Sequence, residues 1–346
     1  MTVDGFFRLE ATMKLPMPRG PITDQLLFEL RAAPHPFTIK SAHSADSAIG
    51  DEDLQLALFA CYELHYQSFD GVDDEWEWYL SLLALREKLE ERLAQKLAPV
   101  PLRPHVSAAS VPQELKQLVA TADSGPPLSG FLHKTASLEQ FREFVMHRSI
   151  YHLKEADPHT WGIPRLYGPA KAALVEIQAD EYGGGRAERM HSELFRTTMC
   201  ALELDDSYGA YLDQVPAVTL AISNVMSMFG LHRRYRGALL GHLAAFEMTS
   251  SLPNFKYSEG LRRLGGGARA RRFYDEHVQA DAVHEQIAVH DMCGSFADAH
   301  PNLAGDILYG ADCALTLDRM FAEHVMNCWT KGVTSLREEY PEAGPR

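Results

Sequence analysis

The chain has 346 residues, enough for about two domains at ~150 residues each. Hydrophobic residues make up 46% and charged residues 23% of it, as in ordinary globular proteins. Lysines and arginines number 33 against 47 aspartates and glutamates, a formal net charge of −14. This balance argues against general binding to nucleic acid or to an anionic membrane surface. The 47 acids and 16 histidines instead offer a large pool of candidate metal ligands.

The cysteines and the N-terminus favour an intracellular chain. The five cysteines are scattered, odd in number and without a C-x-x-C pair: Cys61, Cys200, Cys293, Cys313 and Cys328. We therefore expect reduced thiols that pack in the interior. The first 14 residues include charges and lack the apolar run of a signal peptide. No segment reaches the ~20 apolar residues of a membrane-spanning helix, so a cytoplasmic protein without membrane contact is expected.

Prolines and glycines divide the first part of the chain. Residues 14–50 contain several prolines and are expected to form a loosely structured lead-in. Apolar spacing predicts helices at about 51–69, through 80–89, and near 112–122. Residues 1–130 are therefore treated as an N-terminal helical extension of unknown role.

Residues 131–346 are expected to form one helical domain. Seven helices are predicted there, near residues 137–156, 164–182, 186–203, 213–229, 234–250, 268–298 and 304–330. No convincing alternation of apolar and polar residues predicts a sheet. The expected fold class is all-α.

The sharpest ligand pattern is His277-x-x-x-Asp281-x-x-His284 on the predicted helix 268–298. At about 100° per residue, Asp281 projects roughly 40° and His284 roughly −20° from His277. The same stripe continues in apolar residues, so the three side chains are expected to face the interior, where a metal ion would satisfy all of them. The alternative is a histidine pair hydrogen-bonded to other side chains, with Asp281 in an ion pair.

Two further segments carry isolated ligand types. Glu247 is a lone carboxylate in an apolar helical segment, and such glutamates usually reach solvent or an arginine. Glu181 and His191 would lie about 15 Å apart on a straight helix. The glycines at 183–185 allow the chain to fold back between them, although alone they would be merely an interhelical turn. Together the segments offer three carboxylates and three imidazoles, a set that suits iron better than structural zinc.

These motifs resemble those of the heme-oxygenase-like diiron oxidases and oxygenases. The resemblance rests on Asp180-Glu181-Tyr182-Gly183 with His191, on Glu247, and on the His277 motif, in that order and separated by ten, fifty-six and thirty residues. It implies a seven-helix bundle over about 137–330. It also implies six metal ligands: Glu181, His191, Glu247, His277, Asp281 and His284. As a first assignment, Glu181 and His191 would hold one iron and His277 and Asp281 the other, with Glu247 and His284 completing the cluster.

The resemblance further implies an O₂-dependent non-heme diiron oxidoreductase. Its two iron ions, cycling between Fe²⁺ and Fe³⁺, would oxidise a small organic substrate by N-oxygenation, desaturation or oxidative carbon–carbon cleavage. An external electron donor and a homodimer stay open as partners. An anionic substrate could be oriented by residues near the core helices, with these candidates: Arg148, Trp161, Arg165 and Arg186.

Several alternatives remain. Glu188-x-x-His191 and Asp281-x-x-His284 imitate a ferritin-like four-helix pattern, in which Glu188 would replace Glu181 as a ligand. The same ligands could belong to a non-catalytic iron-binding protein. A metal-free binding domain would use the polar stripe as a hydrogen-bond network. Glu63 is a weaker candidate for an additional ligand.

Overall fold

The computed structural model describes residues 13–39, 48–97, 100, 103, 105–122 and 125–337, apart from the side chains of residues 279, 281 and 282. Within these residues every regular element is a helix, which confirms the predicted all-α class. The α-helices are α1 (Pro21–Glu29), α2 (Glu52–Glu63), α3 (Leu80–Leu97), α4 (Val111–Thr121), α5 (Leu128–Lys134), α6 (Leu138–His152), α7 (Asp157–Thr160), α8 (Gly168–Glu181), α9 (His191–Ala201), α10 (Ala217–Leu231), α11 (Arg236–Thr249), α12 (Ser251–Arg263), α13 (Ala268–Gln286), α14 (Ser295–Ala299) and α15 (Ala304–Thr330). A π-helix, η7 (Ile287–Gly294), continues α13.

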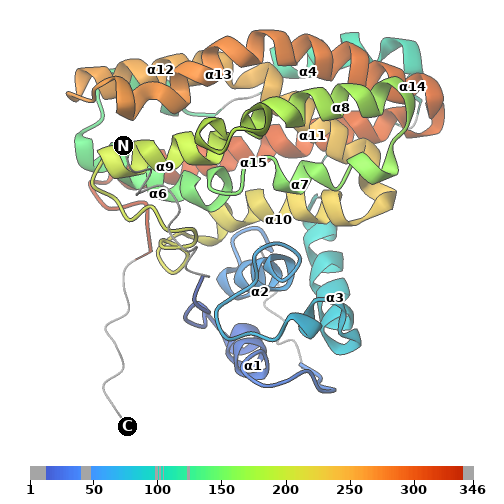
Figure 1. Ribbon diagram of the computed structural model, residues 1–346, viewed down its shortest axis with the longest axis vertical. Helices are drawn as coiled ribbons and strands as arrows, with labels where there is room; N and C mark the ends of the chain where they lie inside the picture. The colour runs from blue at the N-terminus through green and yellow to red at the C-terminus, as the bar shows by residue number, and fades with distance from the viewer. Residues whose placement is uncertain are drawn as a thin grey trace, which may run out of the picture.

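Helix α10 lies between two layers of helices (Figure 1). Helices α1 to α3 lie on one side of it, and α2 packs directly against it. Helices α6, α11 and α15 contact it from the larger bundle. Residues 217–230 of α10 are all buried, as expected for a mostly apolar helix that is covered on both sides.

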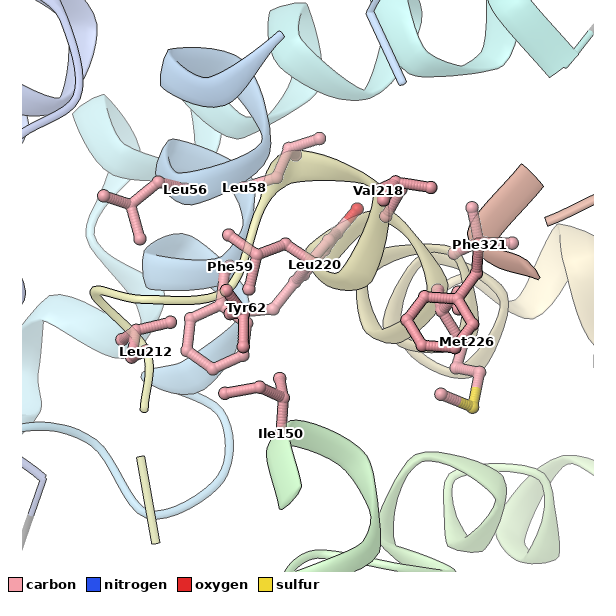
Figure 2. Close-up of a cluster of buried hydrophobic side chains, with 14 of the residues drawn as sticks. Leu56, Leu58, Phe59, Tyr62, Ile150, Leu212, Val218, Leu220, Met226 and Phe321 are labelled. Atoms are coloured by element: carbon pink, nitrogen blue, oxygen red, sulfur yellow. The ribbon is translucent and has the colours of Figure 1, made fainter. Parts of the chain in front are cut away.

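One hydrophobic core runs through this junction. Figure 2 shows side chains of α2, such as Phe59 and Tyr62, beside Leu220 of α10 and Ile150 of α6. The same cluster reaches Phe321 on α15. The first helices therefore share buried apolar surface with the bundle, and the predicted boundary at residue 130 stays a prediction.

Four helices occupy segments where none was expected: α1, α5, α7 and α12. Helix α1 lies inside the predicted lead-in, with Pro21 in its first turn, where the missing N–H would have no helical partner. The Asp53 carboxylate accepts hydrogen bonds from the backbone N–H groups of Ile22 and Thr23 at 2.8 Å, which holds α1 on α2. Helix α12 contains Pro253, again in the first turn, where proline does not break a helix.

Helices α11 and α15 approach each other with their backbones. A Cβ atom at Gly241 of α11 would overlap the carbonyl oxygen of Ile307, and one at Gly310 of α15 would overlap that of Ala238. Only glycine permits this separation. The contact fixes the position of α11, the helix that carries Glu247.

The cysteines follow the sequence expectation in part. Cys61, Cys293 and Cys313 are buried, whereas Cys200 is exposed on α9. In the described part of the chain, no helix combines the length and the apolar character needed to span a membrane.

Candidate metal centre

Five of the six predicted ligands come together inside the bundle with one carboxylate that was not predicted. The first group consists of Glu155, Glu181, His191 and His277, and the second group of Glu181, Glu247 and His284. Within each group, one ligand atom from every residue lies within 4.8 Å of the others. Glu181 belongs to both groups. The arrangement therefore offers two adjacent ion positions joined by one carboxylate.

The triple glycine brings Glu181 and His191 together. Helix α8 ends at Glu181, and Gly183, Gly184 and Gly185 all have positive φ angles, of 66°, 60° and 79°. A Cβ at Gly183 would lie 2.6 Å from the carbonyl carbon of Arg189, so the returning chain needs glycine there. His191 begins α9, with its Nδ1 2.7 Å from Glu181 Oε2.

His277 is oriented by its own helix. Its Nδ1–H donates a hydrogen bond of 2.8 Å to the Phe273 carbonyl oxygen, one turn earlier on α13. The Nε2 lone pair then faces the first group, 3.8 Å from Glu155 Oε1. Burial lowers the pKa of His277 to about 4, so the imidazole is neutral and ready to bind a metal ion.

Glu155 is the ligand candidate that sequence reasoning missed. It follows the end of α6 in a turn, immediately before Ala156, whose φ of 77° is left-handed. Burial favours the protonated form, but His152 and His277 outweigh burial and lower the pKa of Glu155 to about 2. One carboxylate oxygen contacts His152 Nδ1 at 2.8 Å, while the other, Oε2, has no hydrogen-bond partner among the described residues.

The two groups divide the histidines differently from the first assignment. His284 Nδ1 lies 3.4 Å from Glu247 Oε2, and its Nε2 lies 3.3 Å from Asp180 Oδ2. Burial opposes the charged imidazole, but the contact with Glu247 outweighs it and raises the pKa of His284. His277 and His284 thus belong to different groups. His277 shares a group with His191, whereas the first assignment placed these two histidines on different iron ions.

The remaining candidates lie elsewhere or outside the description. Asp281 is on α13 between the two histidines, but its side chain falls outside the described residues. Glu188 is exposed on a 3₁₀ turn and belongs to neither group, contrary to the ferritin-like alternative. Glu63 binds Lys154 instead, at 2.9 Å. The ligand role of the predicted residues stays a prediction.

Glu181 and His191 form a close, buried pair, with Glu181 Oε2 2.7 Å from His191 Nδ1. Burial raises the pKa of Glu181 to about 7, although His191 opposes this shift. Burial disfavours the His191 imidazolium, but the nearby carboxylates of Glu181 and Glu155 outweigh burial and raise its pKa to about 9. The facing atoms, Glu181 Oε2 and His191 Nδ1, have no well-aligned hydrogen-bond partner in the part of the chain that the structure describes. At neutral pH the His191 imidazole is therefore protonated, and its proton occupies a position beside Glu181 that a metal cation could take.

A cavity of about 310 Å³ adjoins both groups. Glu155, Glu181, Glu247 and His277 line it beside aromatic walls that include Tyr151. Of the residues predicted to orient an anionic substrate, Arg148 lines the cavity and the others do not. Trp161 lies outside it. The Arg165 guanidinium donates to the backbone carbonyls of Gly230 and Leu231. Arg186 is exposed.

A family model described as iron-containing redox enzyme matches residues 142–319, just over half of the chain. The chain belongs to this family. The matched segment contains every member of both ligand groups. The family assignment confirms the resemblance predicted from the motifs.

One curated relative is the nitrosourea synthase of Streptomyces achromogenes subsp. streptozoticus. It is 28% identical to this chain over 154 residues, which is 43% of this chain and 31% of the relative. The match thus covers less than a third of that protein's length.

The residues fit the iron that the family implies. Buried atoms with ligand chemistry lack aligned hydrogen-bond partners among the described residues: Glu155 Oε2, Glu181 Oε2, His191 Nδ1 and His284 Nδ1. Carboxylate and imidazole donors without a thiolate suit iron. Burying unpartnered polar groups is costly, and a bound cation would remove that cost.

Proposed function

We propose that the protein binds two iron ions, one at each ligand group, and uses O₂ to oxidise a small organic substrate in the adjoining cavity. The observation that carries this proposal is that Glu181 belongs to both groups. A carboxylate has two oxygens and can serve two ions at once. Glu155, His191 and His277 would complete one ion's protein ligands, and Glu247 and His284 the other's.

The chain's own residues would prepare the reaction. Bound iron would supply the redox chemistry that reduces O₂ and oxidises the substrate. His277 is fixed by its hydrogen bond to Phe273, so its Nε2 has one orientation. The aromatic walls of the cavity, including Tyr151 and Phe246, exclude water from the reacting atoms.

Among the three reaction types implied by the motifs, we favour oxidation of a nitrogen atom. The matched relative is a nitrosourea synthase, and a nitrosourea contains an N–O bond. In such a reaction, one oxygen atom of O₂ forms a new bond to nitrogen and the other leaves as water. Two electrons and two protons are then needed, and an external donor would supply the electrons.

The test is to load the protein with ferrous iron under argon and count the bound ions. Two ions per chain are expected for the wild type, and at most one for His284→Ala. Glu181→Ala should lose most iron from both positions. Glu188→Ala is the matched control, because this carboxylate is nearby in sequence but exposed, and it should keep both ions. Full iron binding by Glu181→Ala would contradict the proposal.

Rapid mixing of the loaded protein with O₂ separates an enzyme from an iron-binding protein. A transient visible absorption that is absent from His284→Ala is expected, followed by faster decay when a substrate is present. Oxygen uptake without turnover of any organic compound would favour the non-catalytic alternative. The cavity beside the ligand groups favours the enzyme, because storage of iron needs no space for an organic molecule.

A further inference from the structure

Five arginines gather on the surface where α12 turns back into α13: Arg189, Arg262, Arg269, Arg271 and Arg272. Three of them lie in the first two turns of α13. At the end of α12, the hydrogen bond from Arg262 lowers the pKa of Glu259, and the nearby charge of Arg271 lowers it further. Arg189, on the turn before α9, reaches Glu276 of α13 at 3.6 Å. We call these five side chains the arginine patch.

Two arginines of the patch have no carboxylate partner. Arg269 and Arg272 are exposed, and neither forms an ion pair with any residue that the structure describes. Arg142 of α6, in contrast, pairs with both Glu139 and Glu203. A guanidinium group is suited to bind carboxylates through two parallel hydrogen bonds. The patch therefore offers two arginines to an acidic partner.

The position of these arginines does not stabilise their own helix. Cations are unfavourable near the N-terminus of a helix, where the backbone dipole is positive. Helix α13 nevertheless has three arginines among its first five residues and no acidic residue in its first turn. The folding of α13 therefore does not account for the arginines, whereas a binding role does.

The patch is joined to the first ligand group by short stretches of backbone. Arg189 precedes His191 by two residues. Arg272 precedes Phe273, whose carbonyl oxygen accepts the hydrogen bond of 2.8 Å from His277 Nδ1. A route of a few covalent bonds and one hydrogen bond therefore leads from the surface to an imidazole that would bind iron.

We propose, building on the function proposed above, that the arginine patch docks a small acidic electron-carrier protein. The proposed oxidation of a nitrogen atom consumes two electrons and two protons. Each docked carrier gives up one electron and is itself oxidised, so two carriers in succession supply one turnover. The two protons come from solvent water.

The charge of the whole chain would direct the carrier to this patch. The formal net charge is −14, so an acidic protein is repelled by the molecule as a whole and attracted where arginines lack partners. Complexes that transfer electrons are typically small and weak. A patch of a few exposed side chains is sufficient for such a complex.

The test measures the binding of an acidic two-iron ferredoxin and of an acidic flavodoxin by surface plasmon resonance. The full chain is used, both iron-free and loaded with ferrous iron under argon. Arg269→Gln/Arg272→Gln should weaken the binding of both carriers roughly three- to tenfold at low salt, because it removes two exposed ion pairs. Salt at about 0.5 M should weaken the wild type more than this variant, because salt screens exposed charges.

The matched control is Arg233→Gln/Arg234→Gln, which removes the same charge from two exposed arginines of η6 (Arg233–Tyr235). This turn leads into α11, where a Cβ at Gly237 would lie 3.5 Å from Phe296 of α14. Figure 1 shows α12 and α14 toward opposite ends of the bundle. The control variant should bind both carriers like the wild type.

Rapid mixing of the reduced ferredoxin with the ferric protein under argon measures the delivery of electrons. Two electrons per chain are expected, at a rate that falls in Arg269→Gln/Arg272→Gln in step with binding. Reduced methyl viologen, a small cation that the patch does not attract, should reduce the variant and the wild type at equal rates.

Three results would overturn the docking role of the patch: equal binding of the carriers by wild type and Arg269→Gln/Arg272→Gln, no binding of either carrier at low salt, and tighter patch-dependent binding of anionic phospholipid vesicles or of a DNA duplex than of the carriers. Because the iron-free chain is measured separately, a failure of docking is distinct from a failure of iron binding. The patch variant should also bind as much iron as the wild type.

Discussion

Two buried charge clusters contain adjacent residues of the chain, and they differ in whether their charges are paired within the protein. Lys154 belongs to one cluster and Glu155, the next residue, to the other. Lys154 Nζ pairs with Glu63 Oε2 at 2.9 Å, and the same oxygen accepts a hydrogen bond of 2.8 Å from the Tyr208 hydroxyl. The rings of Phe59 and Tyr66 flank the ammonium at 4.9 and 4.5 Å. In this lysine cluster, every charge has a partner of the opposite sign.

The ligand groups combine three carboxylates with three imidazoles. Glu155, Glu181 and Glu247 bring three carboxylates to one place, and several ligand atoms there lack an aligned partner among the described residues. A buried charge cluster that is satisfied by its own residues holds the fold together. One with surplus acceptors is complete only when a cation from outside joins it. The two clusters can therefore be told apart by what happens when a charge is removed.

The largest effect is expected in the lysine cluster. Lys154→Met leaves the Glu63 carboxylate buried without its cation, which should lower the free energy of unfolding by about 3–5 kcal/mol. Urea unfolding of the iron-free protein measures it. The double variant Lys154→Met/Glu63→Gln should recover most of the loss, because no unpaired charge remains. A loss below about 1 kcal/mol in the single variant would remove the contrast between the clusters.

A charge removed from the ligand groups should cost the iron-free fold little. Glu181→Gln is expected to change the free energy of unfolding by less than about 1 kcal/mol. The reason is that burial, which raises the pKa of Glu181, offsets its attraction to His191, whose pKa it raises in turn. The same urea titration checks this value. A loss as large as that of Lys154→Met would show that Glu181 is a structural residue.

A third effect is expected in metal binding instead of folding: a proton is released when the metal binds. The pKa of His191 is raised to about 9 by the neighbouring carboxylates, so the imidazole is protonated at neutral pH. A metal ion must displace that proton, so affinity should increase with pH up to about 9, roughly tenfold per unit for each proton displaced. Calorimetric ferrous titrations in two buffers with different ionisation enthalpies count the protons. His191→Ala should lose this release, whereas Arg142→Met should keep it.

The sequence was enough to predict those parts of the metal centre whose geometry a single helix or a single turn determines. His277 and His284 are separated by seven residues, so helical periodicity alone places them on one buried face. The three glycines after Glu181 mark a sharp return of the chain, because each needs the left-handed region that glycine adopts readily. Both features are local, and local geometry can be read from residue order.

The parts that depend on packing between helices were not readable in this way. Glu155 follows α6 between Lys154 and Ala156, where charged residues usually mark a solvated helix end, and only the fold reveals that its side chain is 8% exposed. A histidine three residues earlier, His152, was the available signal, since it contacts the carboxylate. The grouping of His277 with His191 also depends on how α13 packs on α9.

The glycine contact between α11 and α15 has a consequence for the evolution of this chain. Gly241 and Gly310 are far apart in sequence, yet each meets the backbone of the opposite helix where a methyl group has no room. A substitution at one position would push the helices apart and relieve the crowding at the other. In a set of diverged sequences with this fold, the two positions should therefore change together. Where both have become larger residues, α11, the helix that bears Glu247, should lie further from α15. The acidic residue at position 247 should then be longer or shorter, so that its carboxylate still reaches the ligand group.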